Sequence, residues 1–200
     1  AHVDDRCIHV SFAISDLTLE PAGLTLHDGE HALVLGPPRT GRTGSLAAIG
    51  AAARTAGVEV IVVADRPGEL SAWLGLDPVP ADSISDAADR ASRRLLLVDD
   101  ADRVSDPSGL LAGLAASTTG STHLVASTTA DRLRSSYGHW LHEMRACRTG
   151  MLFRPGPLDA DLLGAAVPSR LAPVPVPGRG LIVADGTVEV VQVAVAAPPA

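Results

Sequence analysis

The segment 36–43, GPPRTGRT, constrains the fold of this chain more than any other stretch of its sequence. It follows a short apolar run, HALVLG, and precedes an alanine-rich run, GSLAAIGAAAR. Its residues match the phosphate-loop spacing G-x-x-x-x-G-K-[ST] at every fixed position except one, where Arg42 replaces the lysine. Because this motif has meaning only between a strand and a helix, the sequence predicts a strand–loop–helix unit here.

Apolar runs alternate with helical patterns along the chain. Strands are predicted at 7–14, 31–36, 58–64, 94–100, 122–127, 149–154, 180–184 and 188–195. Helices are predicted at 43–56, 83–93, 107–117, 129–143 and 158–164. This alternation predicts an α/β fold with a mainly parallel sheet and helices on both of its faces. The DG turn at 185–186 predicts that the last two strands form a C-terminal β-hairpin.

The composition fits one well-packed domain, which we expect to span residues 1–200. The chain is 46% hydrophobic, and its two cysteines, Cys7 and Cys147, show no spacing typical of a disulfide framework or a zinc site. No apolar run approaches the roughly 18 residues that a membrane span needs. We expect a soluble protein of a reducing compartment. Because the sequence begins with Ala1 rather than methionine, we also expect a module excised from a longer, multi-module chain.

The glycine-rich loop supplies the candidate nucleotide-binding residues. They are Gly36, Pro37, Pro38, Arg39, Thr40, Gly41, Arg42, Thr43 and Gly44. Successive backbone N–H groups and the N-terminus of the following helix create a positive hollow for phosphate, and the Thr43 hydroxyl is placed to bind Mg²⁺. The alternative is a strand-to-helix turn without a ligand. Pro37 and Pro38 favour this alternative, because they stiffen the loop and remove two N–H donors.

Arg42 has two interpretations. All 16 basic residues are arginines, which indicates a GC-rich genome in which codon pressure replaces lysine. However, the lysine of this motif must reach the β- and γ-phosphates as a compact ammonium, and an arginine is a poor substitute there. The replacement therefore indicates relaxed selection on hydrolysis.

A second motif, LLLVDD at 95–100, resembles a Walker B strand. In that interpretation Asp99 holds the magnesium shell and Asp100 is the catalytic carboxylate that activates water. Asp100 is one methylene shorter than the glutamate common at this position, so its reach is reduced. The alternative is a buried strand that ends in a solvated acidic turn. Ser127 and Thr128, at the end of the next predicted strand, are candidates for a polar sensor of the γ-phosphate.

Several longer stretches together carry a family resemblance. They are LTLEPAGLTLHDGEHALVLGPPRTGR, LLLVDDADR, HLVASTTADRLRSSYGHWLHEMRACRTGMLFRP, DADLLG and PGRGLIVADGTVEVVQVA. They resemble the FtsK/SpoIIIE family of motor ATPases, and most of all the tandem ATPase modules of the actinobacterial type VII secretion motor EccC and its FHA-linked relatives. The resemblance implies a RecA-like P-loop NTPase core that works in a chain of modules or a ring. Terminal modules of such motors are often degenerate, and this sequence departs from the active pattern at Arg42, at Asp100 and at the loop prolines.

The resemblance implies a degenerate nucleotide-binding module that regulates or docks substrate in type VII-like protein secretion. Its cofactors would be ATP and Mg²⁺, bound weakly or no longer bound. Its partners would be neighbouring ATPase modules of the same chain or ring, and a secreted protein. We expect a cytoplasmic location in a membrane-anchored complex, with membrane contact only through segments outside this sequence.

Two other functions stay open: an active ATP-hydrolysing motor domain and a DNA-translocating module. The formal charge of −7 without a basic run argues against this domain gripping DNA alone. Arg145 and Arg148 are candidates for an arginine finger, but surface roles are commoner for such residues. Trp73 and Leu74 are candidates for the lip of a substrate groove, although burial in the core is the commoner fate.

We expect Arg42→Lys to strengthen ATP binding, because an ammonium fits between the β- and γ-oxygens whereas a guanidinium is too wide. Titration with labelled ATP and Mg²⁺ measures the change. If affinity stays the same while the native chain already binds ATP at micromolar levels, the argument for degeneracy is wrong.

Overall fold

The computed structural model describes residues 2–4, 6–84, 93–167, 171 and 175–194. Its strands form one mixed sheet in the order β1-β2-β10-β9-β8-β4-β7-β6-β5, and β3 also pairs with β2. The five neighbouring parallel strands are β8 (Thr149–Leu152), β4 (Ala32–Leu35), β7 (Thr122–Thr128), β6 (Arg94–Val98) and β5 (Glu59–Val62). The antiparallel strands are β1 (His2–Val3), β2 (Cys7–Ser15), β3 (Pro21–His27), β9 (Arg179–Ala184) and β10 (Thr187–Val193).

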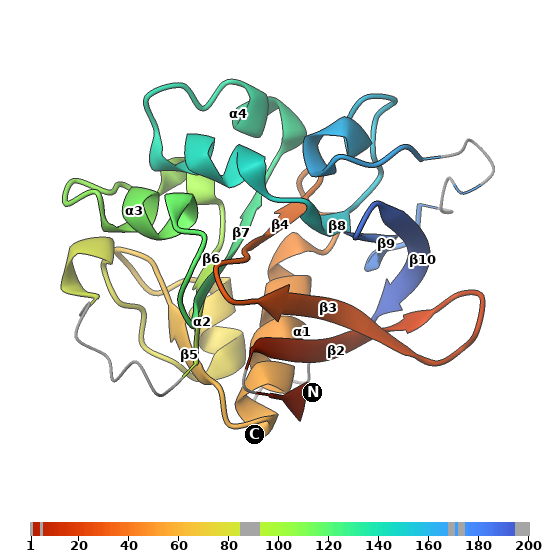
Figure 1. Ribbon diagram of the computed structural model, residues 1–200, viewed down its shortest axis with the longest axis horizontal. Coiled ribbons are helices and arrows are strands. Elements are labelled where there is room, and N and C mark those ends of the chain that lie inside the picture. The colour runs from red at the N-terminus through yellow and green to blue at the C-terminus, as the bar shows by residue number, and fades with distance from the viewer. Residues whose placement is uncertain (1, 5, 85–92, 168–170, 172–174, 195–200) are drawn as a thin grey trace.

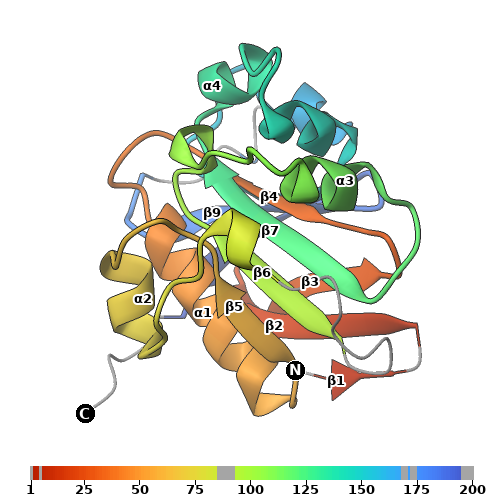
Figure 2. The ribbon, with the colours of Figure 1, turned by 90° about the vertical axis from the view of Figure 1, so that its left-hand side faces the viewer.

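The long helix α1 (Arg42–Thr55) and the short helix α2 (Glu69–Leu74) cover one face of the parallel strands (Figure 2). The alanine-rich sequence of α1 has high helix propensity. Its Leu46 and Ile49 are buried in one hydrophobic cluster with Val34 of β4 and Leu97 of β6. Complete burial of a leucine contributes about 1.5–3 kcal/mol. This packing therefore fixes the N-terminus of α1 against the ends of the central strands.

The opposite face carries α3 (Leu110–Ala116), α4 (Ala130–Arg134) and, among the described residues, the four 3₁₀ turns η1 to η4 (Figure 1). These turns are η1 (Ala81–Ser83), η2 (Ala101–Arg103), η3 (Trp140–Ala146) and η4 (Ala160–Leu163). Leu111, Leu141 and Leu163 lie in a second buried cluster with Leu33 and Leu96. Side chains of β4 and β6 thus enter both clusters, which explains why these strands read as continuous apolar runs. None of the described helices is long and apolar enough to cross a membrane.

The predicted α/β class with layers on both faces is confirmed, and so is the hairpin of β9 and β10, in which Thr187 pairs with Ala184. The prediction of a mainly parallel sheet is only partly right, because half of the strands are antiparallel. The reason is local: the turn between β2 and β3 and the turn between β9 and β10 are each too short for anything but an antiparallel pair.

Other differences concern single elements. The predicted strand positions agree with the structure, but β1, β3 and α2 were not predicted. The expected helix at 129–143 is divided into α4 and η3 by Gly138, whose φ is +74°. The expected helix at 158–164 is only the 3₁₀ turn η4. Most of the expected helix at 83–93 and part of the proline-rich segment 168–180 lie outside the described residues.

We expect Gly150→Ala to lower the free energy of unfolding by about 2–3 kcal/mol. A Cβ at Gly150 of β8 would lie 2.2 Å from the backbone oxygen of Leu33, so the β4–β8 pair would have to separate. Gly113→Ala is the matched control. Gly113 lies inside α3 with nothing within 4 Å of the added Cβ, and alanine there should stabilise by about 0.4–1 kcal/mol. Urea unfolding followed by circular dichroism measures both, and equal effects would contradict the expectation.

Candidate nucleotide site

The glycine-rich loop leaves the carboxyl end of β4 and enters α1, as the motif requires. The Gly36 N–H donates to the Thr128 oxygen at 3.2 Å, and the buried Thr40 hydroxyl donates to the Pro37 oxygen at 2.8 Å. Gly41 precedes α1 with a φ of +112°, a conformation that favours glycine. The first N–H groups of a helix have no acceptor within the helix and attract anions. The first turn of α1 contains no acidic residue that would occupy them.

Asp99 and Asp100 follow the fully buried strand β6 and lie beside this loop. The Thr43 hydroxyl donates to Asp99 Oδ2 at 2.7 Å, and the Ser127 hydroxyl donates to Asp99 Oδ1 at 2.5 Å. The Asp100 N–H donates to Ser127 Oγ at 3.1 Å. The ends of α1, β6 and β7 are thus joined at one carboxylate. Thr128 does not take part, because its hydroxyl donates to Asp102 at 2.9 Å.

An ion pair crosses the loop between Arg42 and Asp100. Arg42 Nη2 lies 2.6 Å from Asp100 Oδ1, and the side chains are 11% and 42% exposed. Arg42 Nη1 is buried without a hydrogen-bond partner among the described residues. Arg103 adds a longer contact of 3.8 Å to the other oxygen of Asp100. The cation of the loop therefore faces a carboxylate of its own chain, and the carboxylate expected to act on water is engaged by that cation.

Backbone conformations that are rare for residues other than glycine occur at three positions around the loop. Arg39, Asp100 and Arg154 have φ values of 62°, 43° and 44°. They follow β4, β6 and β8, whose carboxyl ends reach the same edge of the sheet. Such residues cost about 1–3 kcal/mol each and gather at functional sites. Three of the five such residues in the described part of the chain lie at this edge; the other two, Leu19 and Asp185, lie in hairpin turns.

Arg154 is a candidate that the sequence interpretation missed. The N–H of the preceding Phe153 donates to the Leu35 oxygen at 2.8 Å, so Arg154 comes directly beside the start of the glycine-rich loop. Its Nη2 lies 3.4 Å from the Pro175 oxygen. The sequence did contain a signal for Arg154. The predicted strand TGMLFR ends in this arginine, just as the predicted strand HALVLG ends in the glycine-rich loop.

The two candidates for an arginine finger and the two candidates for the lip of a substrate groove are not fully exposed beside the loop. Arg145 and Arg148 precede β8 and therefore lie at the amino edge of the parallel strands, away from the loop. Leu74 is buried against α1, so it forms no exposed lip. Trp73 is half-buried beside the first turn of α1, and its ring lies 3.6 Å from the position of a Cβ at Gly44.

The oxygen atoms beside the loop match the preference of Mg²⁺, which takes carboxylates, hydroxyls and phosphate oxygens. Thr43 and Asp99 are already in hydrogen-bond contact, so both can face one ion. Within the described part of the chain, no group of three or more His, Cys, Asp and Glu side chains could hold a metal by itself. The donor set therefore fits a magnesium ion that arrives with a phosphate.

No protein-family model and no curated protein matches the sequence. Solved structures do match the fold. EssC (ATPases 2 and 3) from Geobacillus thermodenitrificans has a TM-score of 0.69 at 15% identity, over 94% of this chain and 41% of that one. EccC (ATPases 2 and 3) from Thermomonospora curvata, solved with a signal sequence peptide, has a TM-score of 0.65 at 16% identity, over 96% and 41%.

The chain has a fold similar to that of the ATPase domains of EssC and of the type VII secretion ATPase EccC. The resemblance to this group in the sequence is thereby confirmed at the level of the fold. A further match is the conjugation coupling protein TcpA of pCW3 with ATPγS, with a TM-score of 0.60 at 11% identity, over 95% of this chain and 66% of that one. The chain spans less than half of the solved EssC and EccC chains.

The ion pair changes the expectation for Asp100. From the sequence alone, Asp100→Asn should leave nucleotide binding intact, whereas Asp99→Asn should weaken it in the presence of Mg²⁺. Because Asp100 holds Arg42, we now expect Asp100→Asn to free the guanidinium for phosphate. A charge-assisted hydrogen bond contributes about 1.5–3 kcal/mol, so ATP affinity without Mg²⁺ should rise about tenfold.

Titration with a fluorescent ATP analogue in EDTA measures this change. Asp102→Asn is the control, because Asp102 bonds Thr128 rather than Arg42, and it should leave the affinity within twofold. An unchanged affinity in Asp100→Asn, together with a loss in Asp99→Asn when Mg²⁺ is present, would instead support the expectation from sequence.

Proposed function

We propose that this chain is a weakly catalytic nucleotide-binding module of an FtsK/SpoIIIE-type translocase that works in type VII-like protein secretion. Its core is of the RecA-like type, extended by antiparallel strands. The observation that supports the proposal most is the 2.6 Å contact between Arg42 and Asp100. This contact couples two of the positions at which the sequence departs from an active phosphate loop and its carboxylate; the loop prolines are the third departure.

ATP would bind with its phosphates at residues 36–44 and with Mg²⁺ between Thr43 and Asp99. Thr43 and Asp99 would hold this ion, which would neutralise phosphate charge. Arg42 would then have to leave Asp100 to reach a phosphate. Asp100 would face water with a side chain that is one methylene shorter than glutamate. Binding survives such changes more readily than catalysis, which needs each contact in the transition state.

The proposed role is therefore regulation or docking rather than rapid turnover. The partners would be neighbouring ATPase modules of the same chain or ring, and a secreted protein substrate. Two facts about other proteins support this: the EssC and EccC chains each contain more than one ATPase, and the EccC structure contains a signal sequence peptide. A cytoplasmic location in a membrane-anchored complex is supported by a further structural match, which is the cytoplasmic domain of EssC.

The main alternative is an active ATPase in which Arg42 takes the place of lysine. Phosphate release at saturating Mg-ATP separates the two, measured for the purified chain alone and with its flanking modules. We expect turnover well below one per second from the chain alone, because each lost transition-state contact costs about a hundredfold. Turnover of about one per second or faster, which is ordinary for enzymes, would contradict the proposal and support an active ATPase.

The double variant Arg42→Lys/Asp100→Glu provides the matched comparison. It restores the lysine and the longer carboxylate while leaving the loop prolines in place, and turnover should rise by tenfold or more. A DNA-translocating module is tested separately by salt-dependent binding to duplex DNA. The formal charge of −7 predicts that the chain binds duplex DNA weakly.

A further inference from the structure

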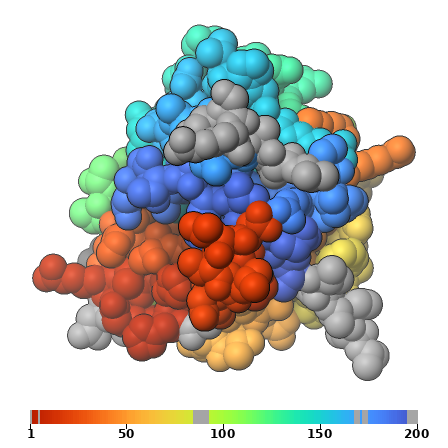
Figure 3. Space-filling view, turned by 90° about the vertical axis from the view of Figure 1, so that its right-hand side faces the viewer, coloured from red at the N-terminus to blue at the C-terminus, as the bar shows by residue number. Residues whose placement is uncertain are grey.

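Trp73 of α2 lies over the first turn of α1, directly after the glycine-rich loop. Its ring lies 3.6 Å from the position that a Cβ of Gly44 would take. Because position 44 is a glycine, no side chain separates the ring from the helix N-terminus. The indole is half-buried, since part of it packs against the first hydrophobic cluster and the rest is open to solvent. In Figure 3 the orange atoms of the loop project at the right-hand edge above the yellow atoms of α2, and Figure 2 shows the same arrangement from the opposite side.

The other aromatic side chains of the protein cannot serve the loop in this way. The sequence contains two Trp, two Phe and one Tyr. Phe12, Trp140 and Phe153 are buried in the two clusters. Tyr137 is 76% exposed, but it lies between α4 and η3 on the opposite face of the sheet. Trp73 is therefore the aromatic side chain that is both partly exposed and beside the loop.

The first turn of α1 indicates the direction in which a bound nucleotide would run. The N–H groups of residues 42–44 find no acceptor among the described residues. The side chains of Arg42 and Thr43 extend to the acidic residues that follow β6, so Mg²⁺ and the terminal phosphates belong on that side. Gly44 follows about 100° further around the helix and faces Trp73 instead. The α-phosphate and the nucleoside would therefore leave the loop toward Trp73.

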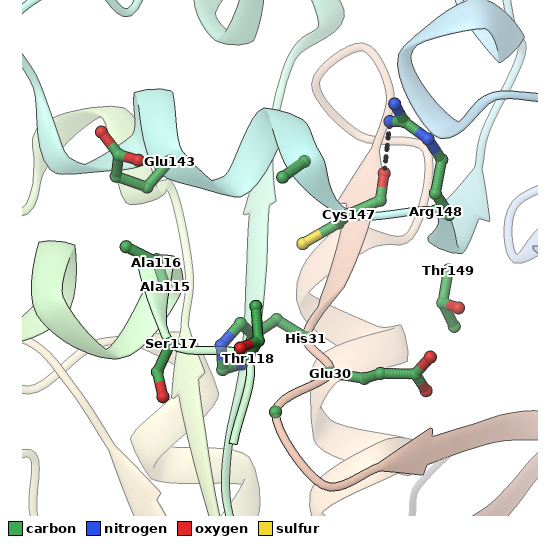
Figure 4. A pocket seen from close by; sticks show the side chains of 12 residues that line it. Glu30, His31, Ala115, Ala116, Ser117, Thr118, Glu143, Cys147, Arg148 and Thr149 are labelled. Atoms are coloured by element: carbon green, nitrogen blue, oxygen red, sulfur yellow. Dashed lines mark hydrogen bonds between the residues drawn. The ribbon is translucent and has the colours of Figure 1, made fainter. Parts of the chain in front are cut away.

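The recess at the other edge of the sheet does not suit a nucleoside held by this loop. It has a volume of about 320 Å³ and is lined by residues 29–31, 115–118, 143 and 146–149. It lies at the end of β4 where the strand begins, whereas the glycine-rich loop follows the end of β4. Figure 4 shows that the carboxylates of Glu30 and Glu143 point outward from its walls, where they would repel phosphate.

We propose that Trp73 stacks on the base of a bound nucleoside triphosphate, and that this contact lets the site distinguish a nucleotide from a bare polyphosphate. The inference rests on the proposed function in taking residues 36–44 as the phosphate site. Stacking on an aromatic ring strengthens the binding of a base by about fivefold to a hundredfold. Such a contact supplies affinity that does not depend on Arg42. It offers a physical reason why binding would survive at a loop that departs from the active pattern.

Calorimetric titration with ATP and with inorganic tripolyphosphate, each with Mg²⁺, tests the contact. Both ligands carry three linked phosphates, and only ATP carries a base. We expect the native chain to bind ATP at least about fivefold more tightly than tripolyphosphate. Trp73→Ala should remove this difference by weakening ATP binding alone, and Trp73→Phe should retain most of it because a ring remains. Tyr137→Ala is the matched control and should change neither affinity, because Tyr137 is exposed on the opposite face.

Three results would overturn the role of Trp73. They are equal affinity of the native chain for both ligands, an ATP affinity that Trp73→Ala leaves unchanged, and an equal loss of both affinities in Trp73→Ala. The last result would show that the ring only supports the loop. ATP binds the native chain in all three cases, so the nucleotide-binding function would survive them. Binding of neither ligand would overturn the nucleotide-binding function, and the role of Trp73 with it.

Tryptophan fluorescence gives a second measurement. In Trp140→Phe the one remaining tryptophan is Trp73, so its emission reports on the ring beside the loop. We expect ATP to change this emission and tripolyphosphate to leave it constant, because only a base stacks on the indole. In Trp73→Phe the remaining Trp140 is buried, with its Nε1 donating to the Val104 oxygen at 2.8 Å, and its emission should stay constant. Constant emission of Trp73 at ATP concentrations that saturate the site by calorimetry would overturn the proposal.

Discussion

The parallel pairing of β4 with strands on both of its sides is the constraint on which the site depends. Leu35, the last residue of β4, is in register with Thr128 of β7 and with Leu152 of β8. Through β7, Val98 of β6 is in register with Ala126. The segments that follow these four strands therefore leave the sheet at one edge. All four residues of β4 are buried, so any shift in register would disturb both hydrophobic clusters at once.

At this edge the Arg42 guanidinium has a carboxylate partner, and under the proposed function a phosphate would compete for it. Arg42 is largely buried, and a buried cation without a counter-charge is costly. Asp100 supplies that counter-charge when no phosphate is present. A lysine could reach into the loop as a point charge, but a planar guanidinium is well matched to a carboxylate. Under the proposed function, the pair that stabilises the loop would therefore oppose the contacts that turnover needs.

Much of the fold could be predicted because its signals are local. The runs at β4 and β6 are apolar and rich in leucine and valine, and the DG turn defines the last hairpin. Strand β3 was not predicted from the sequence because it begins with Pro21, Ala22 and Gly23, which have low strand propensity. It forms because its leucines, Leu24 and Leu26, bury in the first cluster when paired with β2. Tertiary packing decided that element.

The sequence by itself determined the strand–loop–helix unit at 36–43 and placed Thr43 with Asp99, since both follow from the motif order and from strands that end together. Only the tertiary structure decided that Arg42 pairs with Asp100 and that Arg154 comes beside the loop. Propensity and periodicity act over a few residues along the chain. The partner of a charged side chain 58 positions away depends on strand register and side-chain reach, which exist only once the sheet has formed.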